Sequence, residues 1–269
     1  MEYRYIKYER GKVARVILNR PQYNNALSFA MMDEIDRAFR RGVSDEEVKV
    51  IVLSGEGDQF CSGHDLGTPE HKAEHEQQKD LGYSVLAQSW RPDTFLRWRN
   101  LTKPTIAMVH GYCIFAGYGL AASMDVIFAS NDALFLPQLL FYPPMPWDFG
   151  PRKAKELMFE HRFMTASEAR ERGLVNRVYK RDKLEKETLA YAERVADNYY
   201  EALAAKRVFN NMLDLMGFTS HMYAGYFVQV SSGRYLADRR ELIEQRNLSR
   251  ADVALRNLKL SFGETEVDQ

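Results

Sequence analysis

The sequence contains few cysteines and no excess of charge of either sign. Its 269 residues include only two cysteines, Cys61 and Cys113, which lie far apart and match no metal-binding spacing. Lysine and arginine together number 37, and so do aspartate and glutamate, so the formal net charge is zero. This balance gives no electrostatic reason to expect nucleic acid or an anionic membrane as a partner. Cysteine this sparse fits a reduced, cytoplasmic protein.

Long hydrophobic runs are also missing. The uncharged stretch around residue 111 is broken at Asp125, which is too early for a membrane-spanning helix. The first residues, Met-Glu-Tyr-Arg-Tyr, are charged, so we expect no signal peptide there. Hydrophobic residues still make up 45% of the chain, which is enough for the packed core of one large globular domain.

Short apolar runs alternate with helical patterns along the first half of the chain. The apolar runs that predict strands are residues 13–18, 48–53, 105–109 and 126–129. Between the first two, Ser28 can cap a helix that continues to about Arg41. Strands that alternate with helices predict an α/β domain with a largely parallel sheet.

Residues 68–99 are polar and rich in helix formers, and they predict an exposed helical excursion between two strands. His71 and His75 lie one helical turn apart there and could form a metal pair. No third ligand is evident and charged residues surround them, so a solvated helix face is the better interpretation and we predict no metal site. We divide the chain into a core over residues 1–197 and a helical region over residues 198–269.

Two turns that follow predicted strands share a composition suited to binding an anion. One is the small-residue stretch 111–119, Gly-Tyr-Cys-Ile-Phe-Ala-Gly-Tyr-Gly, which leads into a helix. The other is the stretch 60–66, Phe-Cys-Ser-Gly-His-Asp-Leu. Turns at the ends of parallel strands lie on one edge of the sheet, where ligands bind. One N–H from each turn would form an oxyanion hole, although tight turns that serve only backbone geometry explain the glycines too.

Seven short motifs occur in an order that resembles the crotonase (enoyl-CoA hydratase/isomerase) family. In chain order they are Leu18-Asn-Arg-Pro21, Asn25-Ala-Leu27, Phe60-Cys-Ser-Gly-His-Asp-Leu66, Lys103-Pro-Thr-Ile-Ala, Gly111-Tyr-Cys-Ile-Phe-Ala-Gly117, Met124-Asp-Val-Ile-Phe-Ala129 and Ala166-Ser-Glu-Ala-Arg-Glu-Arg-Gly-Leu-Val175. The resemblance implies an α/β fold of the crotonase-like (ClpP/crotonase) type, with a repeated ββα spiral core and a C-terminal helical trimerisation region. It implies a homotrimer or a hexamer of paired trimers.

The resemblance also implies an acyl-CoA thioester as substrate, a role in fatty acid metabolism, and no cofactor other than coenzyme A as part of the substrate. It assigns the two enolate-stabilising N–H groups to His64 and Ala116, the second of which is usually glycine in the family. The positions that it suggests for substrate binding are Ala26, Cys61, Ser62, Asp65, Leu66, Gly117, Gln138, Tyr142 and Trp147.

The sequence departs from the family at the two glutamates with which its hydratases activate water. Gly119 stands three residues beyond Ala116, where the first glutamate is expected, and Gln138 follows Pro137 where the second is expected. An amide is neither a base nor an acid near pH 7. Ordinary hydration of an enoyl-CoA by two glutamates is therefore not predicted, and a lyase, isomerase or C–C-cleaving step is expected instead.

Asp148 is the first candidate for the missing acid or base, because other family members carry a catalytic aspartate near this place. Its neighbours Trp147 and Phe149 would raise its pKa if the carboxyl group were buried. The alternative is that Asp148 caps the helix that begins near Pro151. His64 is the second candidate, since the Gly-His-Asp form resembles methylmalonyl-CoA decarboxylases of the family. The alternative is that only its N–H matters and that its ring packs or caps.

Two other functions remain open. Gly117 and Gly119 fit part of a dinucleotide fingerprint, with Asp132 as a would-be ribose ligand, which would make the protein an NAD-dependent oxidoreductase. The short helix that follows argues against this. Loss of both glutamates would also suit a non-catalytic acyl-CoA-binding protein. Bulky residues that suggest an apolar substrate tail or ring, and equally fit a core, are Phe95, Trp98, Phe141 and Trp147.

Overall fold

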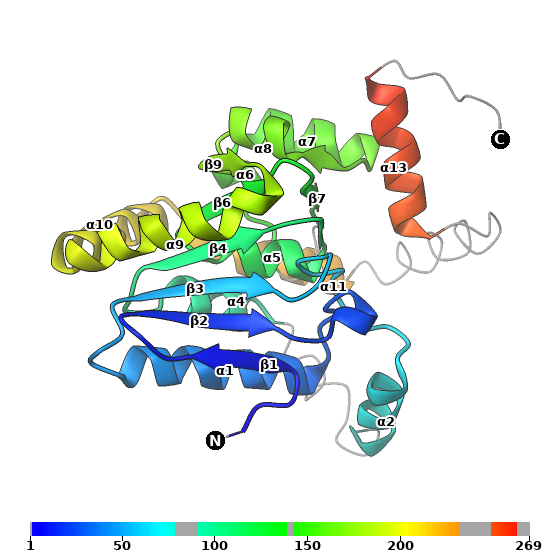
Figure 1. The fold of residues 1–269 in the computed structure, drawn as a ribbon. Helices are drawn as coiled ribbons and strands as arrows, with labels where there is room; N and C mark the ends of the chain where they lie inside the picture. Colours follow the sequence, from blue (N-terminus) through cyan, green and yellow to red (C-terminus); the bar gives the residue numbers. More distant parts are fainter. Residues whose placement is uncertain (1, 79–90, 139–141, 232–248, 263–269) are drawn as a thin grey trace.

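A computed structural model describes residues 2–78, 91–138, 142–231 and 249–262 of the chain (Figure 1). A larger sheet runs through the middle of the molecule, with helices on both of its faces. Its strands, in spatial order, are β1 (Ile6–Glu9), β2 (Val13–Leu18), β3 (Val50–Gly55), β4 (Thr105–Val109), β6 (Val126–Ser130) and β9 (Arg177–Tyr179). All neighbouring pairs are parallel except β1 with β2. The predicted parallel sheet is confirmed, with β3 beginning two residues later than expected.

A second, smaller sheet rises from the ends of the first. It consists of β5 (Tyr112–Ile114), β7 (Leu134–Leu136) and β8 (Met164–Thr165). β5 follows β4 and β7 follows β6, so each of these two long strands is succeeded by a short strand in the other sheet and then by a helix. This repetition matches the expected ββα pattern and carries the 111–119 turn to the edge where the two sheets meet.

The larger sheet is buried on both faces. Along β3, Ile51 and Leu53 belong to one hydrophobic core, whereas Val50 and Val52 belong to another. Successive side chains of a strand point to opposite faces, and a sheet covered on both sides therefore requires an unbroken apolar run. The sequence supplies such a run at residues 50–53.

Most of the described helices cover the faces of this sheet, whereas α2 and α13 lie away from it (Figure 1). In chain order they are η1 (Pro21–Tyr23), α1 (Phe29–Ser44), α2 (Pro69–Gln78), α4 (Pro92–Arg99), α5 (Ala116–Ala122), α6 (Met145–Asp148), α7 (Pro151–Glu160), α8 (Ala166–Glu171), α9 (Arg181–Asp197), α10 (Tyr199–Leu215), α11 (Phe218–Ser231) and α13 (Arg250–Ser261). The predicted cap of α1 is confirmed, because the side chain of Ser28 accepts a hydrogen bond from the Met31 N–H.

The region 68–99 is helical in its described parts, which are α2 and α4. The side chain of His75 and the whole of Phe141 lie outside the described residues. His71 stacks on Phe29, with ring centroids 6.3 Å apart. Within the described residues no group of three His, Cys, Asp or Glu side chains could hold a metal ion, and no helix is long and apolar enough to cross a membrane.

The C-terminal helices take different places. α9 covers one face of the larger sheet, and α11 contacts α4 on the other side. α13 stands apart from them at the end of the smaller sheet (Figure 1), where Ala254 packs among Ile114, Leu136 and Phe163. The proposed division into residues 1–197 and 198–269 stays a prediction.

Candidate active site

The turn between β5 and α5 presents the start of a helix. Phe115 joins the two elements with a φ of 49°, a left-handed conformation that is uncommon outside glycine. Its N–H donates to the carbonyl of Leu136, and its carbonyl accepts from the N–H of Gly119. Helical hydrogen bonding therefore begins at Gly119, so the N–H groups of the first helical residues, Ala116 included, lie at the positive end of α5.

The turn at residues 60–66 lies directly beside this helix start. Cys61 donates its N–H to the carbonyl of Tyr112, and its carbonyl accepts from the N–H of Ile114, at 2.9 Å each. A Cβ placed on Gly117 would lie only 2.8 Å from the Cβ, Sγ and carbonyl oxygen of Cys61. Only glycine, which has no Cβ, lets the backbone at position 117 come this close to Cys61, so Gly117 allows the two turns to make contact.

The hydrogen bonds around His64 direct its N–H away from Leu27. Leu27 donates to the carbonyl of Gly63 and accepts from the N–H of Asp65, which forms a parallel bridge around His64. The middle residue of such a bridge directs its own N–H and carbonyl away from the partner strand. The two N–H groups predicted to bind an enolate, those of His64 and Ala116, thus belong to two turns that are in contact.

Asp148 contacts α5 rather than capping the next helix. It is the last residue of α6, and its Oδ2 accepts a hydrogen bond from the phenol of Tyr118 at 3.3 Å. The predicted capping alternative is wrong, because α7 starts at Pro151 and its cap residue is Gly150. Burial raises the pKa of Asp148 from 3.8 to about 7, although the hydrogen bond from Tyr118 works in the opposite direction.

A cluster of aromatic side chains lies along the cavity that Asp148 also lines. Trp147 and Tyr142 both pack edge-on against Phe218, with ring centroids 5.5 and 6.1 Å apart, and Phe95 stacks on Tyr142 at 5.4 Å. The Tyr142 hydroxyl and the Trp147 indole N–H are buried and have no hydrogen-bond partner among the described residues. Burial and the negative charge of Asp148 raise the pKa of Tyr142, so its hydroxyl stays a donor. Unpaired buried donors of this kind suit a ligand with an acceptor oxygen.

A cavity of about 500 Å³ opens beside Asp148 and Tyr142. Ala122 and Met124 line it at the far end of α5, and α10 contributes Lys206. The Lys206 ammonium group is paired with Asp125 at 2.8 Å and donates to the carbonyl of Lys103 at 3.0 Å. Burial lowers the pKa of Lys206, while Asp125 opposes the change. The cavity therefore combines apolar walls with charges that are already neutralised.

Neither place of the family's two glutamates offers a carboxylate. At Gly119, a Cβ would come 3.2 Å from Cε1 of Phe95, so an aromatic ring occupies the space into which a side chain would project. Gln138 lies just after β7 and is half-buried. Instead of these glutamates, the carboxyl group that contacts α5 is that of Asp148.

The ring of His64 has little capacity to act as an acid. Burial, and secondly the positive charge of Arg250, lower its pKa from 6.5 to about 3. The imidazole is therefore neutral at pH 7 and carries no extra proton to donate.

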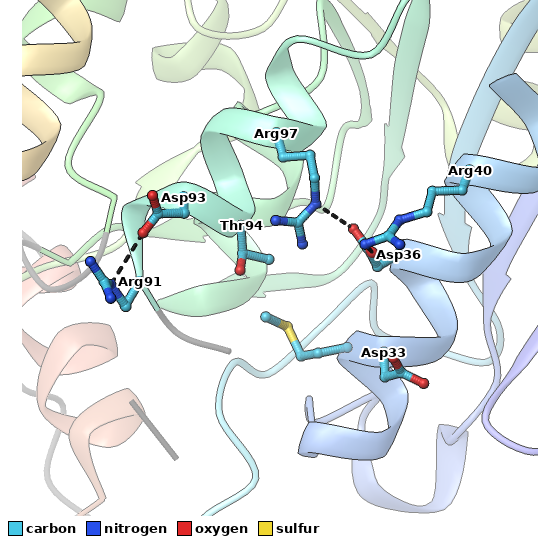
Figure 2. Close-up of a pocket in the computed structure, with 8 residues that line it drawn as sticks. Asp33, Asp36, Arg40, Arg91, Asp93, Thr94 and Arg97 are labelled. Carbon is cyan, nitrogen blue, oxygen red and sulfur yellow. Dashed lines mark hydrogen bonds and ion pairs between the residues drawn. The ribbon is translucent and has the colours of Figure 1, made fainter. Parts of the chain in front are cut away.

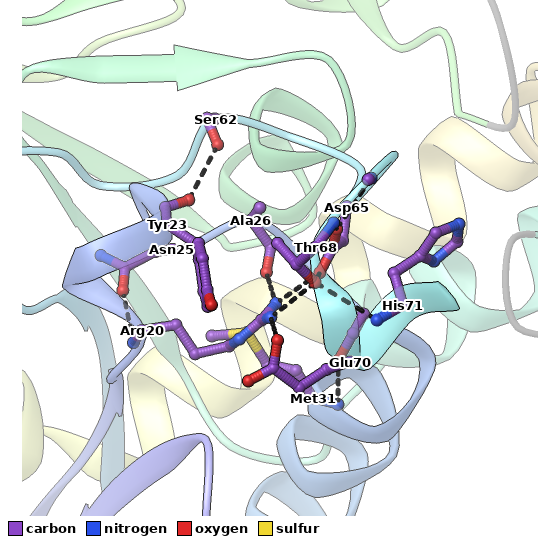
Figure 3. A network of polar contacts seen from close by, with 12 residues as sticks. Arg20, Tyr23, Asn25, Ala26, Met31, Ser62, Asp65, Thr68, Glu70 and His71 are labelled. Atoms are coloured by element: carbon purple, nitrogen blue, oxygen red, sulfur yellow. Dashed lines mark hydrogen bonds and ion pairs between the residues drawn. The ribbon is translucent and has the colours of Figure 1, made fainter. Parts of the chain in front are cut away.

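Several predicted substrate-binding residues lie in a polar network around Arg20 (Figure 3). The Arg20 guanidinium pairs with Asp65 at 2.9 Å and donates to the carbonyl of Ala26 at 2.6 Å, and both charged side chains are 1% exposed. Ser62 donates to the carbonyl of Tyr23 at the edge of this network. Leu66, in contrast, is 83% exposed. The network fixes the turn that contains His64, and the substrate contacts of these residues stay predictions.

A further cavity, of about 420 Å³, lies between α1 and α4 (Figure 2). Its arginines are paired with its aspartates: Arg97 and Arg40 with Asp36, and Arg91 with Asp93. These charges neutralise one another, whereas the site around Asp148 contains two buried uncharged donors without a hydrogen-bond partner among the described residues, the Tyr142 hydroxyl and the Trp147 N–H.

The sequence offered Tyr118 and Tyr142 as possible hydrogen-bond donors but did not single out Tyr118 as the partner of Asp148, because the chain has 15 tyrosines and most tyrosines pack in the interior. The place of Tyr118 two residues after Ala116 was the only available signal. Arg250 was missed entirely, because nothing in the sequence connects it with His64. Asp132, the ribose ligand of the dinucleotide interpretation, is ion-paired with Arg181 at 2.6 Å.

The chain is similar to proteins of one family. The sequence model of enoyl-CoA hydratase/isomerase matches residues 9–224. A Mycobacterium tuberculosis protein named as an enoyl-CoA hydratase, EchA13, is 35% identical over 246 residues, which cover 81% of this chain and 77% of that protein.

Solved structures agree with this match. A probable enoyl-CoA hydratase from Mycobacterium smegmatis has 39% sequence identity and a TM-score of 0.75, and the match covers 87% of this chain and 96% of that one. An enoyl-CoA hydratase/isomerase from Xanthobacter autotrophicus Py2 has 31% identity and a TM-score of 0.77, covering 86% of this chain and 87% of that one.

Proposed function

The chain belongs to the enoyl-CoA hydratase/isomerase family, also called the crotonase family, and from this membership we propose that it acts on an acyl-CoA thioester. The predicted crotonase-like fold is confirmed, because solved structures of the family match most of the chain. The reaction that we propose is proton transfer at the carbon next to the thioester, with the resulting negative charge held on the thioester oxygen.

Two backbone N–H groups, of His64 and Ala116, would hold that oxygen. Support comes from the contact of their turns through Gly117 and from the hydrogen bonds that direct the His64 N–H away from Leu27. Donors fixed in place before the reaction stabilise a charge that develops during it, and loss of one such donor typically slows a reaction by about 10²–10³-fold. Ala116 retains the N–H that a glycine would offer.

Asp148 would transfer the proton, and its environment is the observation that carries this proposal. A pKa of about 7 leaves both protonation states populated at neutral pH, as a group that first accepts and then donates a proton requires. Tyr118 holds the carboxyl group against α5, two residues along the helix from Ala116.

The proposed reaction is a shift of a double bond. The Asp148 carboxylate takes a proton from carbon 2 of a 3-enoyl group. The electron pair of that C–H bond forms a double bond between carbons 1 and 2, and the π pair of the carbonyl moves to the thioester oxygen, which gives an enolate conjugated with the double bond between carbons 3 and 4. The Asp148 carboxyl group then returns the proton to carbon 4. The double bond moves by one carbon, and no atom is gained or lost. One titratable group is enough for this isomerisation, whereas hydration by the family's usual route needs two carboxylates.

Other outcomes remain testable. A lyase or C–C-cleaving step would use the same enolate, with carbon rather than a proton as the leaving group. The relatives named as hydratases make hydration a third outcome. A protein that binds CoA thioesters without turnover would instead be a binding protein with a decayed site, and turnover that needs NAD would support the dehydrogenase alternative.

The test is a panel of CoA thioesters: 2-enoyl, 3-enoyl, dienoyl, malonyl-type and cyclic β-keto acyl groups. We expect interconversion of 3-enoyl and 2-enoyl thioesters, followed by ultraviolet absorbance of the conjugated product. Asp148→Asn should lower kcat by at least about 100-fold and leave the dissociation constant, measured by calorimetry, nearly unchanged. Asp182→Asn, at an exposed position of α9, is the matched control. Full turnover by Asp148→Asn would show that another group moves the proton.

We also propose a homotrimer, or a hexamer of two trimers, in the cytoplasm. Apolar side chains on α10, including Val208, Phe209 and Leu215, are 59–82% exposed in the single chain and could be covered by a second copy. Analytical ultracentrifugation of the purified protein tests the assembly, and a monomer at micromolar concentration would contradict it.

A further inference from the structure

Helix α13 is fixed to the smaller sheet and to the end of α7 by contacts along its length. Ala254 is fully buried against this sheet, and its carbonyl accepts a hydrogen bond from the N–H of Phe163. Further along, the Asn257 side chain donates to the carbonyls of Glu160 and His161 at 2.7 and 3.2 Å. These contacts set where the first residue of the helix lies.

That first residue is Arg250. Ser249 caps the helix by accepting a hydrogen bond from the N–H of Asp252, whose carboxylate accepts one from the Ser249 N–H in return. The Arg250 guanidinium lies over the ring of Phe115, 5.7 Å from its centroid. Phe115 is the strained residue that directly precedes Ala116, so α13 delivers a positive charge to one turn of the proposed oxyanion hole.

The positive charge of Arg250 also acts on the turn that contains His64. The positive charge of Arg250 contributes to the lowered pKa of His64, after burial, which is the larger cause. An arginine on a C-terminal helix is thus next to Phe115 and within electrostatic reach of His64. His64 carries one of the two N–H groups that would bind the enolate oxygen, and Phe115 directly precedes Ala116, which carries the other.

We propose that Arg250 is a positioning residue for the enolate: held over Phe115 by α13, its guanidinium stabilises the negative charge that develops between the N–H groups of His64 and Ala116. The inference rests on the proposed function. Arg250 acts through its electric field across the Phe115 ring and does not touch the reacting atoms. A full charge remains effective over several ångströms where the protein excludes water. α13 is then a part of the catalytic apparatus.

Arg250→Gln tests this, because it removes the charge and keeps a polar side chain. The field acts on a charge present only during the reaction, so kcat should fall by about tenfold while the dissociation constant of the substrate stays the same. Arg250→Lys should retain most of the activity. Arg256→Gln removes an exposed charge from the same helix and should have no effect.

A second measurement needs no turnover. The histidine ring signals of each variant are followed against pH by NMR, with the His64 signal identified by its loss in His64→Asn. Arg250→Gln should raise the pKa of His64, and Arg256→Gln should not. Unchanged kcat in Arg250→Gln, alongside active wild-type protein, would overturn the inference, as would an unchanged His64 pKa. A wild-type protein that converts none of the CoA thioesters would overturn the proposed function instead.

Discussion

The ring of Phe95 lies against Gly119, so that a Cβ at position 119 would approach ring atom Cε1 to 3.2 Å. Phe95 is itself held on its other side, since it stacks on Tyr142 and packs edge-on against Trp98 at 5.4 Å each. The space that a hydratase glutamate needs is therefore filled by a side chain that cannot easily move. A glutamate at position 119 would therefore require the packing around it to rearrange as well as the residue to change.

Gly119→Glu should consequently fail to create a hydratase. The added side chain must displace Phe95 from a packed core, and we expect a loss of about 1–3 kcal/mol in the free energy of unfolding. Hydration of a 2-enoyl-CoA should stay at the wild-type level in an absorbance assay. In the double variant Phe95→Ala/Gly119→Glu, the destabilisation should be smaller than the sum of the two single effects, because the ring no longer obstructs the carboxylate. Hydratase activity gained by Gly119→Glu alone would contradict this account of the packing.

The contact between Gly117 and Cys61 should be equally sensitive. Alanine usually stabilises a helix by about 1 kcal/mol relative to glycine, yet Gly117→Ala would place a Cβ 2.8 Å from three atoms of Cys61. We expect the two turns to separate, with a lower melting temperature and at least tenfold slower turnover of the CoA thioester. Gly67→Ala is the matched control, since its Cβ would meet nothing within 4 Å. Equal behaviour of the two variants would show that the turns do not depend on close contact.

The sequence was sufficient for the parts of the fold that depend on local patterns. The run at residues 50–53 is apolar at every position because both faces of β3 are covered, and Ser28 caps α1 because its side chain meets an unpaired N–H. Even there, the strand began two residues later than predicted, since pairing with β2 and β4 rather than hydrophobicity sets its ends.

Contacts between distant segments could not be predicted in this way. Asp148 was found by its position in a family pattern, but a partner for it could not be chosen among the tyrosines. The choice of Tyr118 depends on how α6 packs on α5. Arg250 reaches Phe115 only because α13 is seated on the smaller sheet. The docking of α13 depends on tertiary packing and cannot be predicted from the spacing of residues in the sequence.

Tyr118→Phe should shift the pH dependence of the reaction. The Tyr118 hydroxyl donates to Asp148, which favours the carboxylate and opposes the effect of burial on the pKa. Without this hydrogen bond the pKa of Asp148 rises from its value of about 7, so a rate that requires the carboxylate should reach its plateau at higher pH. A profile of kcat/KM between pH 5 and 9 measures the shift. Tyr112→Phe, on β5, is the control and should leave the profile in place.

Asp148 should also make the fold less stable as the pH rises. Its carboxyl group loses a proton near pH 4 when unfolded and near pH 7 when folded, so the folded state holds more protons between these values. Stability therefore decreases from about pH 4 to pH 7. Asp148→Asn removes this effect and should be more stable than wild type at pH 8, by a few kcal/mol, with the difference vanishing below pH 4. Urea unfolding at pH 4, 6 and 8 tests it, and a wild-type stability independent of pH in this range would refute it.

The pair of Arg20 and Asp65 should contribute to folding in the opposite pH direction. Burial works to raise the pKa of Asp65, but hydrogen bonds from Thr68, Arg20 and Gly67 outweigh it and hold the pKa below 3.8. The carboxylate's contribution is therefore present above pH 4 and is lost as the pH falls through the lowered folded-state pKa. Because both side chains are 1% exposed, Asp65→Asn leaves a buried guanidinium without its counter-charge.

We expect Asp65→Asn to cost about 3–5 kcal/mol of stability at pH 7 and to loosen the turn that carries His64. The double variant Arg20→Met/Asp65→Leu should cost less than Asp65→Asn alone, since no unpaired charge remains in the interior. Glu56→Gln breaks the exposed pair of Lys7 with Glu56 and should cost less than about 1 kcal/mol. If Asp65→Asn were as mild as Glu56→Gln while substrate affinity fell, Asp65 would serve mainly in binding, and the network of Figure 3 would not be what fixes the turn.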